Sequence, residues 1–143
     1  MYKFLQQTVA DYMTRTVKTV TREVSVRDLN EMFERDDFNT YPVEEDAQVV
    51  GLVTKFDVLK CFAFTPSVMV PHYDDLMNRT VADVMTSPFI YVGADTKLTR
   101  VLQLMVEHKI RSIPAIDSEH RLVGIVARED ILRALAACAN KDS

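Results

Sequence analysis

The chain has 143 residues, of which 48% are hydrophobic and 27% charged, and this composition is typical of a globular protein rather than a disordered one. No uncharged apolar run is long enough to cross a bilayer, and the N-terminus does not resemble a secretory signal. The formal net charge of -4 provides no general attraction to nucleic acid or anionic lipid. We therefore expect a cytoplasmic protein with neither a nucleic-acid nor a membrane partner.

Two phrases of the sequence occur twice. Thr8–Thr14 reads TVADYMT and Thr80–Thr86 reads TVADVMT, while GLVTKFD at Gly51–Asp57 has a near twin in GIVARED at Gly124–Asp130. The glycine that opens each closing phrase is expected to permit close packing or a bulge at a strand. Two copies of one unit thus fill almost the whole chain. The predicted domain bounds are 1–64 for the first repeat, 65–79 for a connecting segment and 80–143 for the second repeat.

The first copy predicts alternating strands and helices. Its elements are expected to be a short strand at 18–20, a helix from residue 26, strands at 41–44 and 49–53, and a closing helix at 55–62. Val26, Leu29 and Phe33 have the spacing of one buried helical face. Ser25, three residues before Asp28, is a typical N-cap and indicates where this helix begins.

The second copy predicts the same succession. Its elements are expected to be a strand at 89–92, a helix from residue 98, strands at 113–117 and 122–127, and a closing helix at 128–137. Both copies therefore read β-α-β-β-α, which indicates an α/β protein in the broad sense, of the α+β type. Because one copy alone would bury little apolar surface, we expect the two sheets to pack against each other with pseudo-twofold symmetry.

The connecting stretch between the copies is unusually apolar for a linker. Pro66 and Pro71 prevent a long helix, and Phe64, Leu76 and Met77 are among the side chains that need shelter from water. Two interpretations remain open at this point. The stretch either straps the copies together, or it covers a ligand cleft or a dimer contact.

Taken in order, the doubled V-x-D-x-M-T opening, the x-P-x strand and the closing G-h-h-(T/S)-x-x-D phrase resemble the cystathionine-β-synthase (CBS) domain pair, or Bateman module. The resemblance covers about residues 8–62 and 80–135. It implies two β-α-β-β-α repeats with two related clefts for adenosine-bearing ligands: AMP, ADP, ATP, S-adenosylmethionine or NAD. It also implies that the chain forms a homodimer.

The resemblance further implies which residues contact the ligand. In this family the aspartate that closes the second phrase contacts the ribose hydroxyls, and that role falls here on Asp57 and Asp130. The hydroxyl three residues earlier usually meets a phosphate, which fits Thr54 but not Ala127. The positions implied to lie against adenine are Thr16, Val17, Lys18, Tyr41, Pro88, Phe89, Ile90 and Ile113.

Physical chemistry supports part of this assignment and leaves an alternative open. An ionised carboxylate only accepts hydrogen bonds, so it can receive both hydroxyls of a vicinal diol. Thr54 and Asp57 also fit an ordinary helix cap, however, whereas Ala127 caps poorly, at a cost of about 1 kcal/mol. An aspartate kept at Asp130 without a capping partner indicates a role other than capping. Arg111 and Arg128 are predicted to meet a polyphosphate in the second copy.

No catalytic motif is present in the sequence. There is no G-x-S-x-G or H-E-x-x-H phrase, and the two cysteines have no metal-binding spacing, so we predict neither an enzyme nor a metal site. No obligatory cofactor is expected, and an adenine nucleotide would act as an effector whose occupancy an unidentified effector protein reads. The alternative is a dimerisation scaffold with vestigial clefts, which calorimetry with nucleotides would distinguish.

Overall fold

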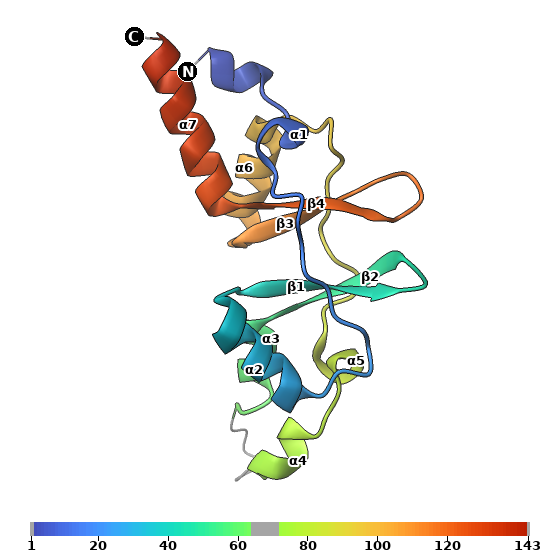
Figure 1. Ribbon diagram of the computed structural model, residues 1–143. Coiled ribbons are helices and arrows are strands. Elements are labelled where there is room, and N and C mark those ends of the chain that lie inside the picture. Colours follow the sequence, from blue (N-terminus) through green and yellow to red (C-terminus); the bar gives the residue numbers. More distant parts are fainter. Residues whose placement is uncertain (1, 64–71, 143) are drawn as a thin grey trace. The chain divides into compact units, whose positions relative to one another are not determined.

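The computed structural model describes residues 2–63 and 72–142, which form two compact units (Figure 1). Residues 18–89 make up the central unit, and residues 1–17 together with 90–143 make up the terminal unit. The predicted connecting prolines and the apolar residues among 64–71 lie outside the described residues. How the repeats pack on each other stays a prediction.

Both units mix short helices with antiparallel hairpins, which confirms the α+β class. The central unit contains α2 (Val26–Asp36), β1 (Thr40–Glu45), β2 (Gln48–Thr54), α3 (Lys55–Lys60), α4 (Tyr73–Met77) and α5 (Val81–Val84). The terminal unit contains the 3-10 helix η1 (Lys3–Gln6), α1 (Val9–Tyr12), α6 (Leu98–His108), β3 (Ser112–Ile116), β4 (Leu122–Ala127) and α7 (Arg128–Asp142). β1 pairs with β2, and β3 with β4.

The first predicted strand of each copy is reduced to a single bridge. Val20 pairs in parallel with Val43, and Val92 pairs with Ala115. The proline in the neighbouring strand explains this shortening: a longer ladder would next require a backbone N–H from Pro42 or Pro114, which proline lacks. The predicted strands at 18–20 and 89–92 are therefore wrong in extent, although their place beside β1 and β3 is right.

The opening phrase of each copy packs with the hairpin of the other copy. Thr14 bridges Ile125 of β4, with both backbone hydrogen bonds at 2.8 and 2.9 Å, and Thr86 bridges Leu52 of β2 at 2.7 and 3.1 Å. In Figure 1 the blue α1 accordingly lies with the orange and red elements of the terminal unit. The compact units thus divide the chain differently from the sequence repeats, because they exchange their opening segments, 8–14 and 80–86.

Glycine in each closing phrase makes this exchange possible. A Cβ atom built on Gly124 would lie 2.6 Å from Met13 Sδ and 2.9 Å from the Thr14 carbonyl oxygen. On Gly51 it would lie 3.1 Å from Met85 Sδ and 3.0 Å from the Thr86 carbonyl oxygen. The absence of a side chain therefore lets the exchanged segment approach the hairpin closely in both units.

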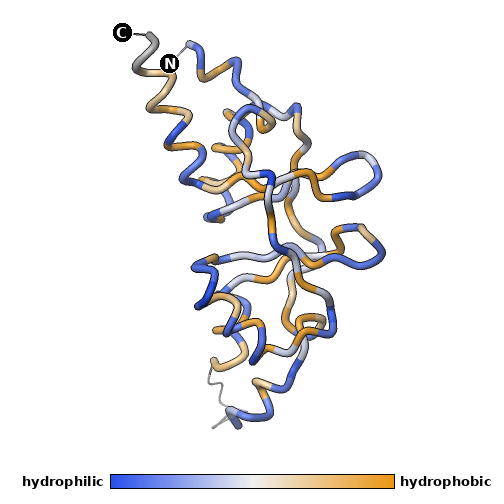
Figure 2. The backbone as a smooth tube through the Cα atoms, viewed as in Figure 1, coloured by the Kyte–Doolittle hydropathy of each residue, from blue (hydrophilic) through white to orange (hydrophobic). Residues whose placement is uncertain are grey.

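Each unit has its own hydrophobic core. In the central unit α2 and β1 pack Phe33 against Tyr41, with 5.0 Å between their ring centroids. Leu76 and Met77 of α4 are also buried, so this part of the predicted connecting segment is sheltered as expected. In the terminal unit α6, α7 and the β3–β4 hairpin share one core, and Figure 2 shows that the tip of this hairpin is hydrophilic.

Two helices end in the left-handed conformation, at Asp37 (φ 54°) and Lys109 (φ 55°). Lysine pays a steric penalty there that glycine avoids, so Lys109→Gly should raise the free energy of unfolding by about 1 kcal/mol in a urea titration. Asp37→Gly is the matched control. Aspartate tolerates this conformation better, so its gain should be smaller, and equal gains would contradict the explanation.

Candidate functional site

Asp57 lies in the first turn of α3 with its side chain 4% exposed. Its Oδ2 atom accepts the backbone N–H of Thr54 at 2.9 Å and the Thr54 hydroxyl at 3.1 Å. Its Oδ1 atom accepts the Thr86 hydroxyl at 3.2 Å and forms an ion pair with the Lys60 ammonium at 3.0 Å. A carboxylate has about four lone-pair positions, so three hydrogen bonds and one ion pair occupy all of them. The Asp57 N–H also donates to Thr54 Oγ1, which confirms the predicted helix cap.

Asp130 holds the corresponding place in α7, with its side chain 6% exposed. Its Oδ2 atom accepts the backbone N–H of Ala127 at 2.8 Å, and its Oδ1 atom forms an ion pair with Nη2 of Arg133 at 3.1 Å. No other donor reaches this carboxylate within residues 2–63 and 72–142. By the same count of about four positions, Asp130 can accept two further hydrogen bonds.

Both carboxylates are connected to an exchanged opening segment. Thr86 lies just after the end of α5, and its hydroxyl donates directly to Asp57. For Asp130 the connection passes through Arg133, whose Nη2 atom also donates to the Tyr12 carbonyl at 3.1 Å while the guanidinium lies 5.8 Å from the Tyr12 ring centroid. This connection was not predicted from the sequence. The sequence feature that could have indicated it is a basic residue three positions after each aspartate: Lys60 after Asp57, and Arg133 after Asp130.

The predicted phosphate-binding residues of the second copy flank the β3–β4 hairpin: Arg111 directly precedes β3, and Arg128 begins α7 directly after β4. The Arg128 N–H donates to the Arg111 carbonyl at 3.0 Å, which holds the two backbones together. The Arg128 side chain pairs with Glu129 at 3.3 Å. Arg111 is exposed, and its guanidinium has no partner in the described part of the chain. The carboxylate of Asp130 and a free guanidinium thus occur in one unit.

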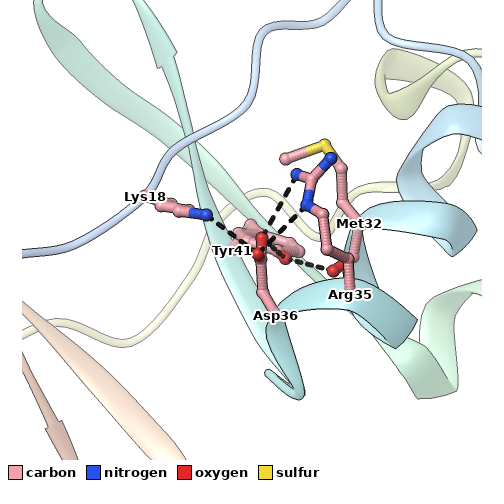
Figure 3. Close-up of polar contacts among 5 residues, drawn as sticks. All are labelled: Lys18, Met32, Arg35, Asp36 and Tyr41. Carbon is pink, nitrogen blue, oxygen red and sulfur yellow. Dashed lines mark hydrogen bonds and ion pairs between the residues drawn. The ribbon is translucent and has the colours of Figure 1, made fainter.

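In the central unit the predicted residues Lys18 and Tyr41 are joined through Asp36 (Figure 3). Lys18 Nζ lies 2.8 Å from Asp36 Oδ1, and the Tyr41 hydroxyl lies 2.8 Å from Asp36 Oδ2 and 2.9 Å from the Met32 carbonyl oxygen. Hydrogen bonds from Lys18, Arg35 and Tyr41 hold the pKa of the Asp36 carboxyl far below its usual range. Burial, followed by the contact with Asp36, raises the pKa of Tyr41.

The predicted site residues divide between the two units. The central unit contains Lys18, Tyr41, Thr54, Asp57, Pro88 and Phe89, whereas the terminal unit contains Thr16, Val17, Ile90, Arg111, Ile113, Arg128 and Asp130. Tyr41 and Ile113 are fully buried in the cores of their own units. Their assignment as adenine contacts stays a prediction.

Neither a metal-binding cluster nor a membrane-spanning helix is found in the described residues. Among them, no group of three or more His, Cys, Asp and Glu side chains is placed to hold a metal ion. None of the helices in this part of the chain is both long and apolar enough to span a membrane.

Comparison with known proteins identifies the class to which this fold and these paired aspartates belong. A model of the CBS domain matches residues 9–63 and 81–137, so the chain belongs to the CBS domain family and carries the domain twice. This match confirms the resemblance derived from the two repeated phrases.

Individual relatives are similar over most of this chain. A homoserine O-acetyltransferase of Methanosarcina acetivorans is 32% identical over 124 residues, which cover 86% of this chain but 21% of that protein. Protein MJ1225 of Methanocaldococcus jannaschii superposes with a TM-score of 0.82 at 24% identity, over 91% of this chain and 48% of that one. CBSX2, crystallised in complex with AMP, superposes with a TM-score of 0.77 at 27% identity, over 91% and 97% of the two chains.

Proposed function

We propose that this CBS pair is a regulatory module that binds an adenosine-bearing ligand through Asp130, and that an effector protein reads its occupancy. The observation that carries the proposal is the unused accepting capacity of the buried Asp130 carboxylate. A ribose offers two adjacent hydroxyl donors, which equals the two positions left open. Hydrogen bonds to an ionised group are stronger than neutral ones, particularly away from water.

Two further observations support a ligand that carries phosphate. Arg111 is exposed and without a partner in the described chain, and its backbone is held against that of Arg128 beside the start of α7. A guanidinium presents its donors in a fork that suits phosphate oxygens. The AMP bound to CBSX2, a structure 27% identical to this chain, has the same combination of ribose and phosphate.

Calorimetry with AMP, ADP, ATP, NAD and S-adenosylmethionine tests the proposal. We expect ATP to bind and Asp130→Ala to weaken it by about tenfold or more, since charge-assisted hydrogen bonds would be lost. Thr54→Ala should weaken ATP less, because the Thr54 hydroxyl is engaged in the cap of α3. Urea unfolding of both variants serves as the control for folding.

The same titrations distinguish the scaffold alternative. No heat with any of the five compounds would favour a dimerisation scaffold, and an equal or larger loss with Thr54→Ala would contradict the ordering of the two sites. A regulatory role also requires that the ligand bind one arrangement of the protein more tightly than another. We include in this proposal that the chain forms a homodimer and that an effector protein reads the occupancy of its site.

The relatives that are named as enzymes do not transfer their activity to this chain. The chain spans 21% of the acetyltransferase that it matches, and that match consists of the residues that form the CBS pair here. We therefore propose regulation and not turnover as the role of the two repeats.

A further inference from the structure

Asp57 and Asp130, the two aspartates predicted to bind ribose, differ in how many of their accepting positions are occupied by groups of the protein. Asp57 accepts three hydrogen bonds, two from Thr54 and one from Thr86, and pairs with Lys60. Among the described residues, Asp130 accepts one hydrogen bond, from Ala127, and pairs with Arg133. A ribose diol can reach Asp130 by adding hydrogen bonds. At Asp57 it would have to displace donors that are already in place.

Two donors to Asp57 have no counterpart in the other unit: the Thr54 hydroxyl, where the second copy has Ala127, and the Thr86 hydroxyl. Thr14 stands at the equivalent place of the first opening phrase and forms the same backbone bridge, to Ile125. Within the described chain, however, the Thr14 hydroxyl makes no hydrogen bond to Asp130. The Thr86 hydroxyl therefore occupies an accepting position of Asp57, and the equivalent position of Asp130 stays open.

The rest of the central site is also satisfied internally. Lys18 and Tyr41, both predicted ligand contacts, are bound to Asp36, whose side chain is 7% exposed. The repeat places His108 where the first copy has Asp36. The Asp57 carboxylate and Lys18 are thus both engaged by neighbours within the described residues, in contrast to the open positions of Asp130 and to Arg111.

We propose that Thr86 keeps the central site closed by donating its hydroxyl to Asp57 in place of a ligand hydroxyl, so that each chain binds one adenosine-class ligand, at Asp130. This inference rests on the proposed function for the open site. Losing a hydroxyl that donates to a charged acceptor typically changes affinity by about tenfold or more, and that competition separates the two sites. A ligand that did enter the central site would break the bond from the Thr86 hydroxyl, while the backbone bridge to Leu52 would remain.

The test is the number of adenosine molecules bound per chain, measured by calorimetry at a concentration that just saturates the Asp130 site. The wild-type chain should bind one. Thr86→Val keeps the β-branched shape and the backbone bridge to Leu52 but removes the hydroxyl, which frees one accepting position of Asp57, so a second adenosine should bind, more weakly than the first. If the valine side chain disturbs folding, Thr86→Ala can replace this variant and should give the same result. Thr86→Ser retains a hydroxyl and should bind one adenosine.

Two matched variants locate the effect. Thr14→Val makes the same change at the equivalent place in the terminal unit and should leave one adenosine bound. Adding Asp57→Ala to Thr86→Val should return the count from two to one, because the second ligand depends on that carboxylate.

Each outcome separates this inference from the proposed function. One adenosine before and after Thr86→Val, or two in the wild type, would overturn the closed site and leave binding at Asp130 intact. None in the wild type but one in Thr86→Val would support the closed site and overturn binding at Asp130. None in either protein would overturn both.

Discussion

Replacing Gly124 with alanine should lower the free energy of unfolding by about 2 kcal/mol, the scale of overpacking in a close contact. The new Cβ would lie 2.6 Å from Met13 Sδ and 2.9 Å from the Thr14 carbonyl oxygen. The methionine side chain can rotate away. The carbonyl cannot retreat without lengthening the hydrogen bond that it accepts from Ile125, now 2.9 Å.

Urea unfolding measures the size of this loss, and amide hydrogen exchange measures its place. In Gly124→Ala the Ile125 amide should exchange faster, because its acceptor is pushed away. Gly93→Ala is the matched control: its nearest neighbour is the Asp95 carboxylate at 3.0 Å, an exposed side chain that can move, and its stability should change by less than about 0.5 kcal/mol.

Gly51→Ala tests whether both exchanged segments are held in the same way. Its closest contacts, 3.0 Å to the Thr86 carbonyl oxygen and 3.1 Å to Met85 Sδ, are less severe, so the loss should fall between those of the other two variants. If Gly124→Ala left the free energy of unfolding unchanged, or if Gly93→Ala lowered it by as much, the opening segments would not depend on this close approach.

Asp130→Asn should weaken adenosine by about 30-fold, because two charge-assisted hydrogen bonds to the ribose would be lost or become neutral. The substitution keeps the size of the side chain, and its amide oxygen can still accept the Ala127 N–H. Calorimetry with adenosine, which has no phosphate, isolates this contribution from the arginines.

The decisive comparison is with 2′,3′-dideoxyadenosine, which lacks both hydroxyls. The wild-type chain should prefer adenosine strongly over it, and Asp130→Asn should bind the two compounds almost equally. Glu129→Gln removes the same charge from the same turn of α7 and should change adenosine affinity less than about twofold. An Asp130→Asn variant that still discriminates the two nucleosides would place the diol elsewhere.

If binding at Asp130 regulates a partner, Arg133 is the group through which the change would pass. Its Nη2 atom pairs with the Asp130 carboxylate and donates a hydrogen bond to the Tyr12 carbonyl, at 3.1 Å in each case. A diol that drew the carboxylate away would therefore alter the contact with the exchanged segment. This route is local, because one side chain touches both the proposed ligand group and the end of α1.

The local elements of this protein could be predicted from the sequence by itself. Apolar spacing placed α2 from Val26 and α6 from Leu98, and Ser25 caps the first of them as its side chain implied. The repeated phrases also marked Asp57 and Asp130 as equivalent positions, and the structure shows that both are buried. These features depend on neighbours within a few residues, which is why they can be read from the chain.

Only the tertiary structure decided which segments share a unit and how well each aspartate is satisfied. The exchange of the opening phrases, the shortening of the first strands beside Pro42 and Pro114, and the bond from Thr86 to Asp57 all join residues far apart in the sequence. Two phrases that read almost alike therefore differ in their free accepting capacity. Part of that difference, Thr54 against Ala127, is visible in the sequence, but the donor from Thr86 reaches Asp57 only through folding, a non-local property that the repeated phrases do not contain.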